Sequence, residues 1–329
     1  MQDITSRPQT TTGTAADAAS NNRKYAILTE KLTKNYGHVR GLVDLDLGVY
    51  EGEVFGFLGP NGAGKTTTIR MLLNLIKPTK GKATVLGLDS QHDSVAIRQH
   101  IGYLPGEFSL YPNLTGAQTL EYFAHLRGVA GKENWKYVQE LAERLELDMT
   151  RKFRQYSRGN KQKVGVIQAL MHHPRLLILD EPTSGLDPLN QQEFYKLVDE
   201  VRKAGSTIFF SSHIMSEVEK ICDRVAIIRE GKLVKVGNIG DLTDLKSHYL
   251  ELTFTGTAPL EEFKKLPGVE KLEKVAEKGT EILHFMVRSE GLDQVVKTAA
   301  KYAVVNFVSR EPSLEESFLD YYRDPSETK

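Results

Sequence analysis

The chain has 329 residues, 40% of them hydrophobic and 26% charged, and its 43 basic and 43 acidic side chains cancel to a formal net charge of zero. This composition is typical of a globular protein of about two domains and excludes an intrinsically disordered chain. The balanced charge lacks the basic excess that nucleic-acid-binding proteins usually show, so we expect no nucleic-acid partner.

The first 24 residues are rich in Ser, Thr, Ala and Asn and contain no apolar core. We interpret them as a disordered tail and not as a secretory signal. No apolar run in the chain approaches the roughly 18 residues that a membrane-spanning helix needs. Cys222 is the only cysteine, which excludes an intrachain disulfide and is typical of a reducing compartment. From residue 25 to residue 245, strand-like and helix-like segments alternate, which predicts an α/β domain with a largely buried sheet.

A glycine-rich loop follows the short apolar segment at residues 54–58 and precedes a helical segment at residues 67–75. Its glycines allow backbone N–H groups to turn toward phosphate oxygens, and the start of the helix adds a positive dipole end. Lys65 can neutralise β- and γ-phosphate charge, and the Thr66 hydroxyl can bind Mg²⁺. The alternative, a chance glycine-rich turn, is disfavoured by the order of strand, loop and helix. The residues that fit the pattern G-x-x-x-x-G-K-[ST] are Gly59, Pro60, Asn61, Gly62, Ala63, Gly64, Lys65 and Thr66.

The strand pattern fades between about residues 107 and 172. Segments 120–126 and 138–147 instead have the apolar spacing of amphipathic helices. We therefore expect a helical subdomain inserted into the α/β domain.

Two acids, Asp180 and Glu181, follow the apolar segment 176–179. Acids at the end of a buried strand are costly unless a cation or a reaction uses them. We assign Asp180 to Mg²⁺, through water, and Glu181 to the water molecule that attacks a phosphate, as its general base. The alternative is that both acids are plain helix caps, which the phosphate loop upstream makes less favourable.

The composition changes near residue 245, and we expect residues 246–329 to form an accessory α+β domain. A last helix is predicted at about 314–322, capped by Ser313. The order of strands and helices before it, βαββαβ, is that of ferredoxin-like domains. The predicted elements are a strand at 248–254, a helix at 260–266, strands at 269–275 and 282–287, a helix at 292–302 and a strand at 304–308.

The segment between the phosphate loop and the acids indicates which family of phosphate-loop proteins the chain resembles. The sequence Y-S-R-G-N at residues 156–160 resembles the Leu-Ser-Gly-Gly-Gln signature of ABC ATPases and lies just upstream of the acid-bearing strand, as in that family. Residues 182–188 are similar to its D-loop, S-S-H at 211–213 to its switch histidine, and Tyr36 to the aromatic that stacks on adenine. The resemblance covers residues 26–240. It implies a P-loop NTPase core of the ABC type that uses ATP and Mg²⁺ and hydrolyses ATP.

The resemblance also implies a role for each matched residue. Ser157 and Gly159 would bind the γ-phosphate held by a second ATPase subunit in a head-to-tail dimer, and Asp187 would couple the two sites. His213 would contact the γ-phosphate and orient Glu181. Taken singly, a histidine after a strand is more often structural and a lone tyrosine more often part of a core, but the order of the motifs favours binding. Further ATP contacts are expected from Tyr36, from the phosphate loop and from Thr67.

The sequence departs from the family pattern at the Q-loop and in the signature. I-G-Y-L-P at 101–105 resembles the lead-in to the Q-loop, but Gly106 and Glu107 stand where Gln is expected. Glu107 is the favoured replacement, as a water-mediated Mg²⁺ ligand, and Gly106 remains the alternative. In the signature, Arg158 replaces a glycine and either adds charge near the γ-phosphate or points to solvent.

The branch of the family is indicated by L-E-E-S-F-L at residues 314–319, which resembles a C-terminal element of ATPases that serve ABC-2 type exporters, including drug and antibiotic efflux systems. The implied partners are membrane-spanning permease subunits, which would hold this chain at the cytoplasmic face of the membrane. The loop carrying Phe108 and Tyr111 would form part of their docking groove, or would pack beneath the helical subdomain. Other readings remain open: an importer ATPase, a soluble family member acting on ribosomes or DNA, and a plain amphipathic helix at 314–322.

Overall fold

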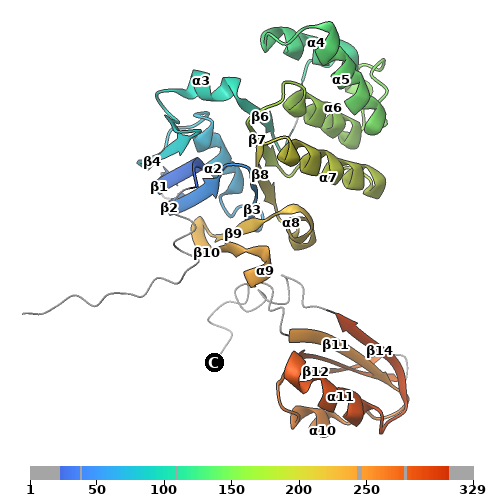
Figure 1. Cartoon of the computed structure of the whole chain (residues 1–329). Helices are drawn as coiled ribbons and strands as arrows, with labels where there is room; N and C mark the ends of the chain where they lie inside the picture. The colour runs from blue at the N-terminus through green and yellow to red at the C-terminus, as the bar shows by residue number, and fades with distance from the viewer. Residues whose placement is uncertain (1–22, 38, 108–109, 243–246, 278–279, 311–329) are drawn as a thin grey trace, which may run out of the picture.

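The computed structural model describes residues 23–37, 39–107, 110–242, 247–277 and 280–310. Residues 1–22 of the tail predicted at 1–24, Phe108 and the predicted helix at 314–322 therefore lie outside the described residues. The described chain forms three sheets with helices packed on them (Figure 1). None of the described helices is long and apolar enough to cross a membrane.

The central sheet has six strands in the order β10-β9-β3-β8-β7-β6. Five of them run parallel and β10 is an antiparallel edge strand. β3, β7 and β8 are buried along their whole length, as expected for strands covered on both faces. Because these three strands are parallel neighbours, their carboxyl ends meet at one edge of the sheet. The strands are β3 (Val54–Leu58), β6 (Ile101–Leu104), β7 (Leu176–Asp180), β8 (Thr207–Ser212), β9 (Arg224–Arg229) and β10 (Lys232–Asn238).

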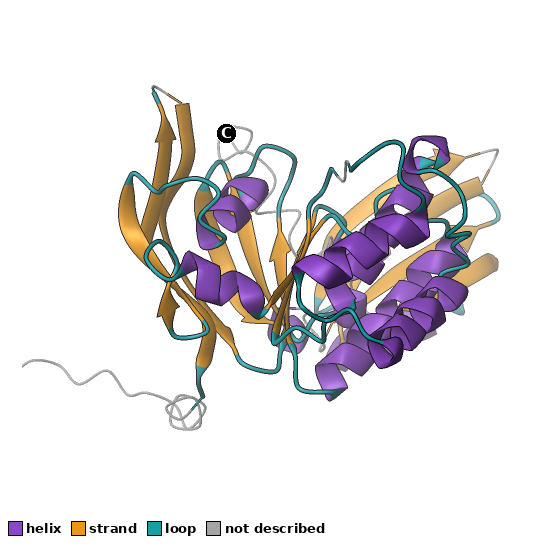
Figure 2. Cartoon of the chain, turned by 90° about the horizontal axis from the view of Figure 1, so that it is seen from above, coloured by secondary structure: helices purple, strands orange, loops and turns teal. Residues whose placement is uncertain are grey.

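A second, antiparallel sheet in the order β2-β1-β4-β5 covers one face of the molecule, with α2 (Lys65–Leu72) between it and the central sheet (Figure 2). The sequence patterns did not predict this sheet. Its register shifts several times between β1 and β2, and Lys31 and Asp44 have positive φ angles of 46° and 43°, so the alternation of apolar and polar residues is broken. The strands are β1 (Tyr25–Tyr36), β2 (Val39–Tyr50), β4 (Lys80–Val85) and β5 (Leu88–Asp89); the short helix α3 (Ser94–Gln99) follows.

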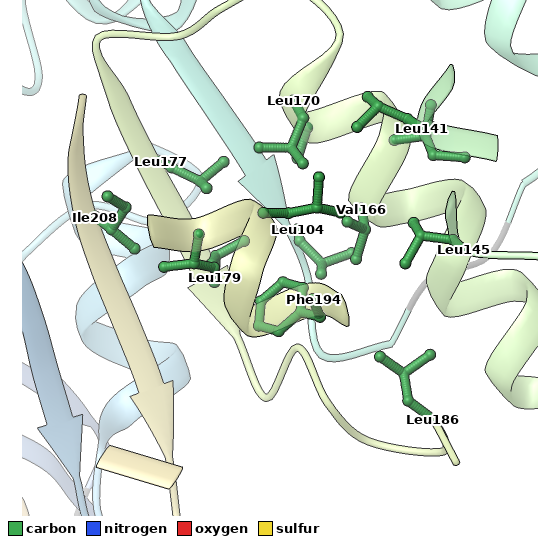
Figure 3. Packing of buried hydrophobic residues seen from close by; sticks show 14 of the residues in the cluster. Leu104, Leu141, Leu145, Val166, Leu170, Leu177, Leu179, Leu186, Phe194 and Ile208 are labelled. Atoms are coloured by element: carbon green, nitrogen blue, oxygen red, sulfur yellow. The ribbon is translucent and has the colours of Figure 1, made fainter. Parts of the chain in front are cut away.

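The helices predicted at 120–126 and 138–147 are confirmed as α4 (Gly116–Leu126) and α5 (Lys132–Arg144). α4 begins earlier than predicted because Thr115 and Gln118 form a reciprocal capping box. α5 ends earlier because Glu146 adopts a left-handed conformation, with φ 52°. Both pack with α6 (Arg158–Leu170) and α7 (Pro188–Lys203) in a core that includes one face of the central sheet (Figure 3).

The C-terminal elements occur in the predicted order βαββαβ. Their sheet has the strand order β12-β13-β11-β14 with all neighbours antiparallel, which is the ferredoxin-like arrangement. Phe254, Phe263 and Phe285 contribute to a third hydrophobic core beneath its helices. The elements are β11 (Ser247–Phe254), α10 (Leu260–Lys264), β12 (Val269–Glu277), β13 (Thr280–Arg288), α11 (Leu292–Ala299) and β14 (Val304–Arg310). Two helices precede them, α8 (Met215–Ile221) and α9 (Ile239–Leu242).

Candidate nucleotide-binding and hydrolysis site

The phosphate-binding loop joins the end of β3 to the start of α2. Gly62 and Gly64 have φ angles of 81° and 108°, which favour glycine. A Cβ on Gly64 would also lie only 2.8 Å from the carbonyl oxygen of Gly41, so this position has no room for a side chain. Gly64 caps α2 without any side-chain hydrogen bond to the helix. The first N–H groups of α2 are thus not capped by a side chain and face the loop, an arrangement suited to an anion.

Lys65 is a buried ammonium whose nearest polar atoms are all oxygens. Its Nζ donates to the carbonyl oxygens of Gly59 at 2.6 Å and Pro60 at 3.3 Å. It also lies 3.2 Å from Oε1 of Glu181. That carboxylate oxygen is buried and makes no hydrogen bond of good geometry, so the ion pair with Lys65 is its main stabilising contact. The loop therefore holds an ammonium among oxygen acceptors, and phosphate oxygens are acceptors of the same kind.

Thr66 and Asp180 bring two oxygen donors together from different elements. The Thr66 hydroxyl at the start of α2 donates to Oδ2 of Asp180 at 2.8 Å. Oδ1 of Asp180 accepts a hydrogen bond from the Ser211 hydroxyl at 2.9 Å, and the Asp180 residue as a whole is 1% exposed. No group of three or more His, Cys, Asp or Glu side chains suited to a metal occurs in the described part of the chain. One hydroxyl and one carboxylate fit Mg²⁺, which prefers oxygen ligands and usually keeps several waters.

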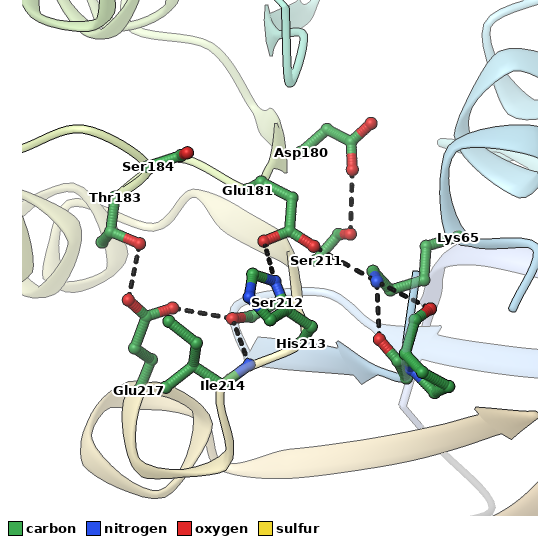
Figure 4. A network of polar contacts seen from close by, with 12 residues as sticks. Lys65, Asp180, Glu181, Thr183, Ser184, Ser211, Ser212, His213, Ile214 and Glu217 are labelled. Carbon is green, nitrogen blue, oxygen red and sulfur yellow. Dashed lines mark hydrogen bonds and ion pairs between the residues drawn. The ribbon is translucent and has the colours of Figure 1, made fainter. Parts of the chain in front are cut away.

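Glu181 and His213 face each other across the ends of β7 and β8 (Figure 4). Nδ1 of His213 lies 2.6 Å from Oε2 of Glu181. Glu181 has a φ of 50°, a conformation that costs about 1–3 kcal/mol for a residue other than glycine. The turn is tied to the rest of the fold by Gln162, whose Nε2 donates to the carbonyl oxygens of Glu181 and Pro182 at 3.3 and 2.9 Å. A strained, hydrogen-bonded carboxylate beside a histidine is a suitable base for water.

One cavity of about 420 Å³ is lined by many of the predicted site residues. A larger cavity of about 500 Å³ lies between α7 and α8 and is lined by none of the predicted residues. Tyr36 does not line the smaller cavity. Its ring is 46% exposed and packs on Gly41, whose carbonyl oxygen lies beside the turn at Gly64. The residues singled out in the sequence that line the smaller cavity are Asn61, Thr66, Gly106, Glu107, Arg158, Asp180, Glu181 and His213.

The sequence patterns did not single out Arg70 and Tyr103, which also line this cavity. Arg70 stands four residues after Thr66 on α2, so helical spacing would have placed both on one face. Tyr103 lies in β6, where burial and then the charge of Asp180 raise its pKa to about 12. Arg70 therefore reaches the site through the spacing of its own helix, whereas Tyr103 reaches it through the pairing of β6 with β7.

The signature segment packs on the D-loop of the same chain. Ser157 caps α6 by accepting a hydrogen bond from the backbone N–H of Asn160 at 3.2 Å. A Cβ on Gly159 would lie 2.4 Å from the carbonyl oxygen of Gly185, so only glycine fits there. Arg158 donates to Ser184 at 2.6 Å and lines the cavity. The guanidinium therefore adds positive charge to the rim of the site.

Asp187 is positioned by the start of α7. Its carboxylate accepts from the backbone N–H of Asn190 at 3.0 Å and from the Asn190 side chain at 2.7 Å. These hydrogen bonds, the backbone one first, hold the pKa of Asp187 below its ordinary value. Within this chain Asp187 is thus a helix cap, and its coupling role across a dimer remains a prediction.

A family model described as ABC transporter matches residues 42–184. An uncharacterized ABC transporter ATP-binding protein from Nostoc sp. is 41% identical over 241 residues, which cover 69% of this chain and 71% of that protein. A bacitracin transport ATP-binding protein from Bacillus licheniformis is 42% identical over 226 residues, which cover 68% of this chain and 74% of that protein. A solved dimeric structure of a bacterial ABC transporter cassette matches with a TM-score of 0.60 and 25% identity, covering 65% of this chain and 98% of that one.

Proposed function

The chain belongs to the ABC transporter family of ATP-binding proteins, and from that membership we propose that it is the ATP-hydrolysing subunit that powers an exporter. The observation that carries the proposal is the 2.6 Å contact between Glu181 and His213 beside the Thr66–Asp180 pair. A base, its orienting histidine and a metal-ligating pair share one cavity with the phosphate loop.

In the proposed reaction the phosphate loop binds the ATP phosphates through the N-terminus of α2 and Lys65. Thr66 and Asp180 would hold Mg²⁺, with Glu107 through water, and the ion would supply charge neutralisation at the β- and γ-phosphates. Glu181 orients a water molecule and accepts its proton, while His213 holds the carboxylate in place. Because Lys65 contacts Glu181, the positive charge of its ammonium acts both on the bound phosphate and on the base.

A head-to-tail dimer completes the proposed site. The chain carries a single set of motifs, and Ser157 with Arg158 forms a cationic helix start at the rim of the cavity. In the dimer this helix start would meet the γ-phosphate bound by the second ATPase subunit. The solved relative of dimeric form supports this arrangement.

Coupling to membrane-spanning permease subunits is the second part of the proposal, and it would hold the chain at the cytoplasmic face of the membrane. Tyr111, Tyr122 and Leu126 are exposed at α4 and the loop before it, and the two tyrosine rings meet edge to face at 5.6 Å. Exposed aromatic anchors of this kind suit a docked helix. The relative named for bacitracin transport favours a transport role over action on ribosomes or DNA. Export in place of import is proposed from the resemblance of L-E-E-S-F-L at residues 314–319 to exporter ATPases.

The proposal is tested by purifying the tagged full chain from membranes of its native host and identifying what accompanies it. We expect multi-span membrane proteins and Mg²⁺-dependent ATP hydrolysis by the complex. A complex with ribosomes or DNA in place of membrane proteins would contradict the transport function. Absence of ATP hydrolysis by a complex that contains membrane partners would contradict the enzymatic function.

A further inference from the structure

Glu217 is a buried acid that none of the assigned roles uses. It lies on α8, four residues after His213, and is 6% exposed. Its Oε1 accepts a hydrogen bond from Thr183 at 2.6 Å, and its Oε2 accepts one from Ser212 at 2.7 Å (Figure 4). A buried carboxylate is retained only where its hydrogen bonds offset the loss of solvation.

The two hydroxyl donors belong to the two segments that carry the catalytic pair. Thr183 stands two residues after Glu181, in the turn that follows β7. Ser212 stands one residue before His213, at the end of β8, and also accepts from the backbone N–H of Ile214 at 3.0 Å. Figure 4 shows Glu217 bridging these segments on the side opposite the Lys65 contact. The segments that carry Glu181 and His213 are thus also joined through Glu217. We call this set of residues the Glu217 clasp: Thr183, Glu217 and Ser212.

The surroundings of Glu217 hold it as an acceptor. The phenol of Tyr195 on α7 lies beside it, and burial together with this carboxylate raises the pKa of the Tyr195 phenol. The ammonium of Lys220 lies 4.6 Å from the centre of the Tyr195 ring. Glu217 thus accepts from two hydroxyl donors, and the phenol of Tyr195 lies next to it. This set of donors fixes the carboxylate in one position.

We propose that Glu217 is a positioning residue for ATP hydrolysis: it holds the turn of Glu181 and the loop of His213 at one separation. The proposal rests on the function proposed above. Glu181 is in a left-handed conformation, and neither it nor His213 is deeply buried. Their short contact therefore depends on what restrains the backbone on either side. Loss of the clasp lets the base move away from its histidine. The clasp meets the phosphate loop only through the backbone, where the N–H of Gly59 donates to the carbonyl oxygen of Ser212 at 3.2 Å, so removal of a side-chain hydroxyl leaves the loop in place.

The test compares variants of Thr183 that differ in the hydroxyl group. Thr183→Val is nearly isosteric and removes the donor, whereas Thr183→Ser keeps it. We expect kcat for ATP hydrolysis by the full chain to fall roughly tenfold or more in Thr183→Val, since small misplacements of reacting groups have effects of this size. The ATP dissociation constant should stay within about twofold of wild type. Thr183→Ser should retain most of the wild-type kcat, and Ser212→Ala should resemble Thr183→Val.

Thr29→Val is the matched control. Thr29 is equally buried, and its hydroxyl donates to the carbonyl oxygen of Leu45 at 2.8 Å in the antiparallel sheet, away from the clasp. Its loss should lower the melting temperature but not kcat. Wild-type kcat in both Thr183→Val and Ser212→Ala, or an equal loss of kcat in Thr29→Val, overturns the positioning role. A wild-type chain that binds ATP but does not hydrolyse it contradicts the proposed function instead.

Discussion

At the scale of single residues, the site contains side chains in conformations or degrees of burial that are unfavourable for their residue types and that contacts with neighbours stabilise. Glu181 accepts an unfavourable backbone conformation, Lys65 is buried against oxygens, and Asp180 is almost fully enclosed. Each cost is compensated by a specific contact: His213, the loop carbonyls, or the hydroxyls of Thr66 and Ser211. Such compensated strain concentrates at functional sites, because reactive geometry is seldom the most stable one.

Glu181→Gln should keep ATP binding but lower turnover by about 100-fold or more, because an amide cannot accept the proton of the attacking water. This change removes the ion pair between Glu181 and Lys65 but leaves the loop backbone and the Thr66–Asp180 pair in place. It should also trap an ATP-bound dimer. ATPase assays and size-exclusion chromatography with ATP check both outcomes. Glu146→Gln is the control, since Glu146 has a similar φ of 52° and lies in the helical subdomain. Hydrolysis at the wild-type rate would remove Glu181 from the mechanism.

Tyr36→Ala should weaken the binding of ATP and GTP alike by about 1–3 kcal/mol, because stacking recognises the face of a base and little else. The exposed ring at the end of β1 and its contact with Gly41 place it near the phosphate loop. Tyr25→Ala is a control in the same strand, where the ring stacks on Tyr50 at 4.9 Å. Calorimetric titration with each nucleotide measures the effect. Equal affinity in Tyr36→Ala and wild type would show that Tyr36 lies outside the site.

At the scale of elements, the helical subdomain presents two different surfaces. Its inner surface joins the core that contains Leu141, Leu145, Val166 and Leu170 (Figure 3). Its outer surface at α4 exposes aromatic side chains. The loop between β6 and α4 connects this outer surface to Glu107 in the cavity, so a short piece of chain links the two. Leu110 in this loop packs on the core, while Tyr111 is 55% exposed.

Tyr111→Ala should leave ATP binding by the free subunit nearly intact and lower transport by the assembled complex. The reason is that the exposed ring contributes little to packing but offers an anchor for a permease helix. Nucleotide affinity of the free chain, together with transport and ATPase activity of the reconstituted complex, measures this. Leu110→Ala is the contrasting variant and should lower the melting temperature of the free chain. Full transport in Tyr111→Ala would contradict the coupling role.

At the scale of the whole molecule, the buried apolar residues of the described part of the chain form three clusters. Two of them occupy opposite faces of the central sheet, as alternate residues of β7 show: Leu177 and Leu179 belong to one, Leu176 and Ile178 to the other. The third lies within the C-terminal elements and shares no residue with the first two. A core that is self-contained is expected to fold by itself.

A chain that ends at residue 245 should therefore fold and bind ATP with the affinity of the full chain. Every residue that lines the cavity precedes this point, and so do both cores of the central sheet. Circular dichroism and nucleotide titration of the truncated chain provide the test, with the full chain measured in parallel. Aggregation of the truncated chain, or a loss of ATP affinity of more than about tenfold, corresponding to 1.4 kcal/mol, would show that the C-terminal elements stabilise the ATPase.

The features that could be predicted from the sequence are those determined by a few consecutive residues. The phosphate loop is such a feature. Its positive φ angles, which favour glycine, and the start of the following helix are both local properties of residues 59–66. The caps at Ser157 and Asp187 and the order of the C-terminal elements are others. The order of helices and strands can be predicted from the spacing of apolar residues, because each helix or strand buries one of its faces.

The remaining features depend on the order of strands in the sheet, which periodicity does not specify. The order β3-β8-β7 brings Glu181 to His213, 32 residues away in sequence, and Thr66 to Asp180, 114 residues away. The same packing brings Tyr103 into the cavity. The sequence by itself therefore determined which residue types are available for binding phosphate and activating water. Only the tertiary structure decided which of them meet, because their contacts form between the ends of strands that lie far apart in the chain.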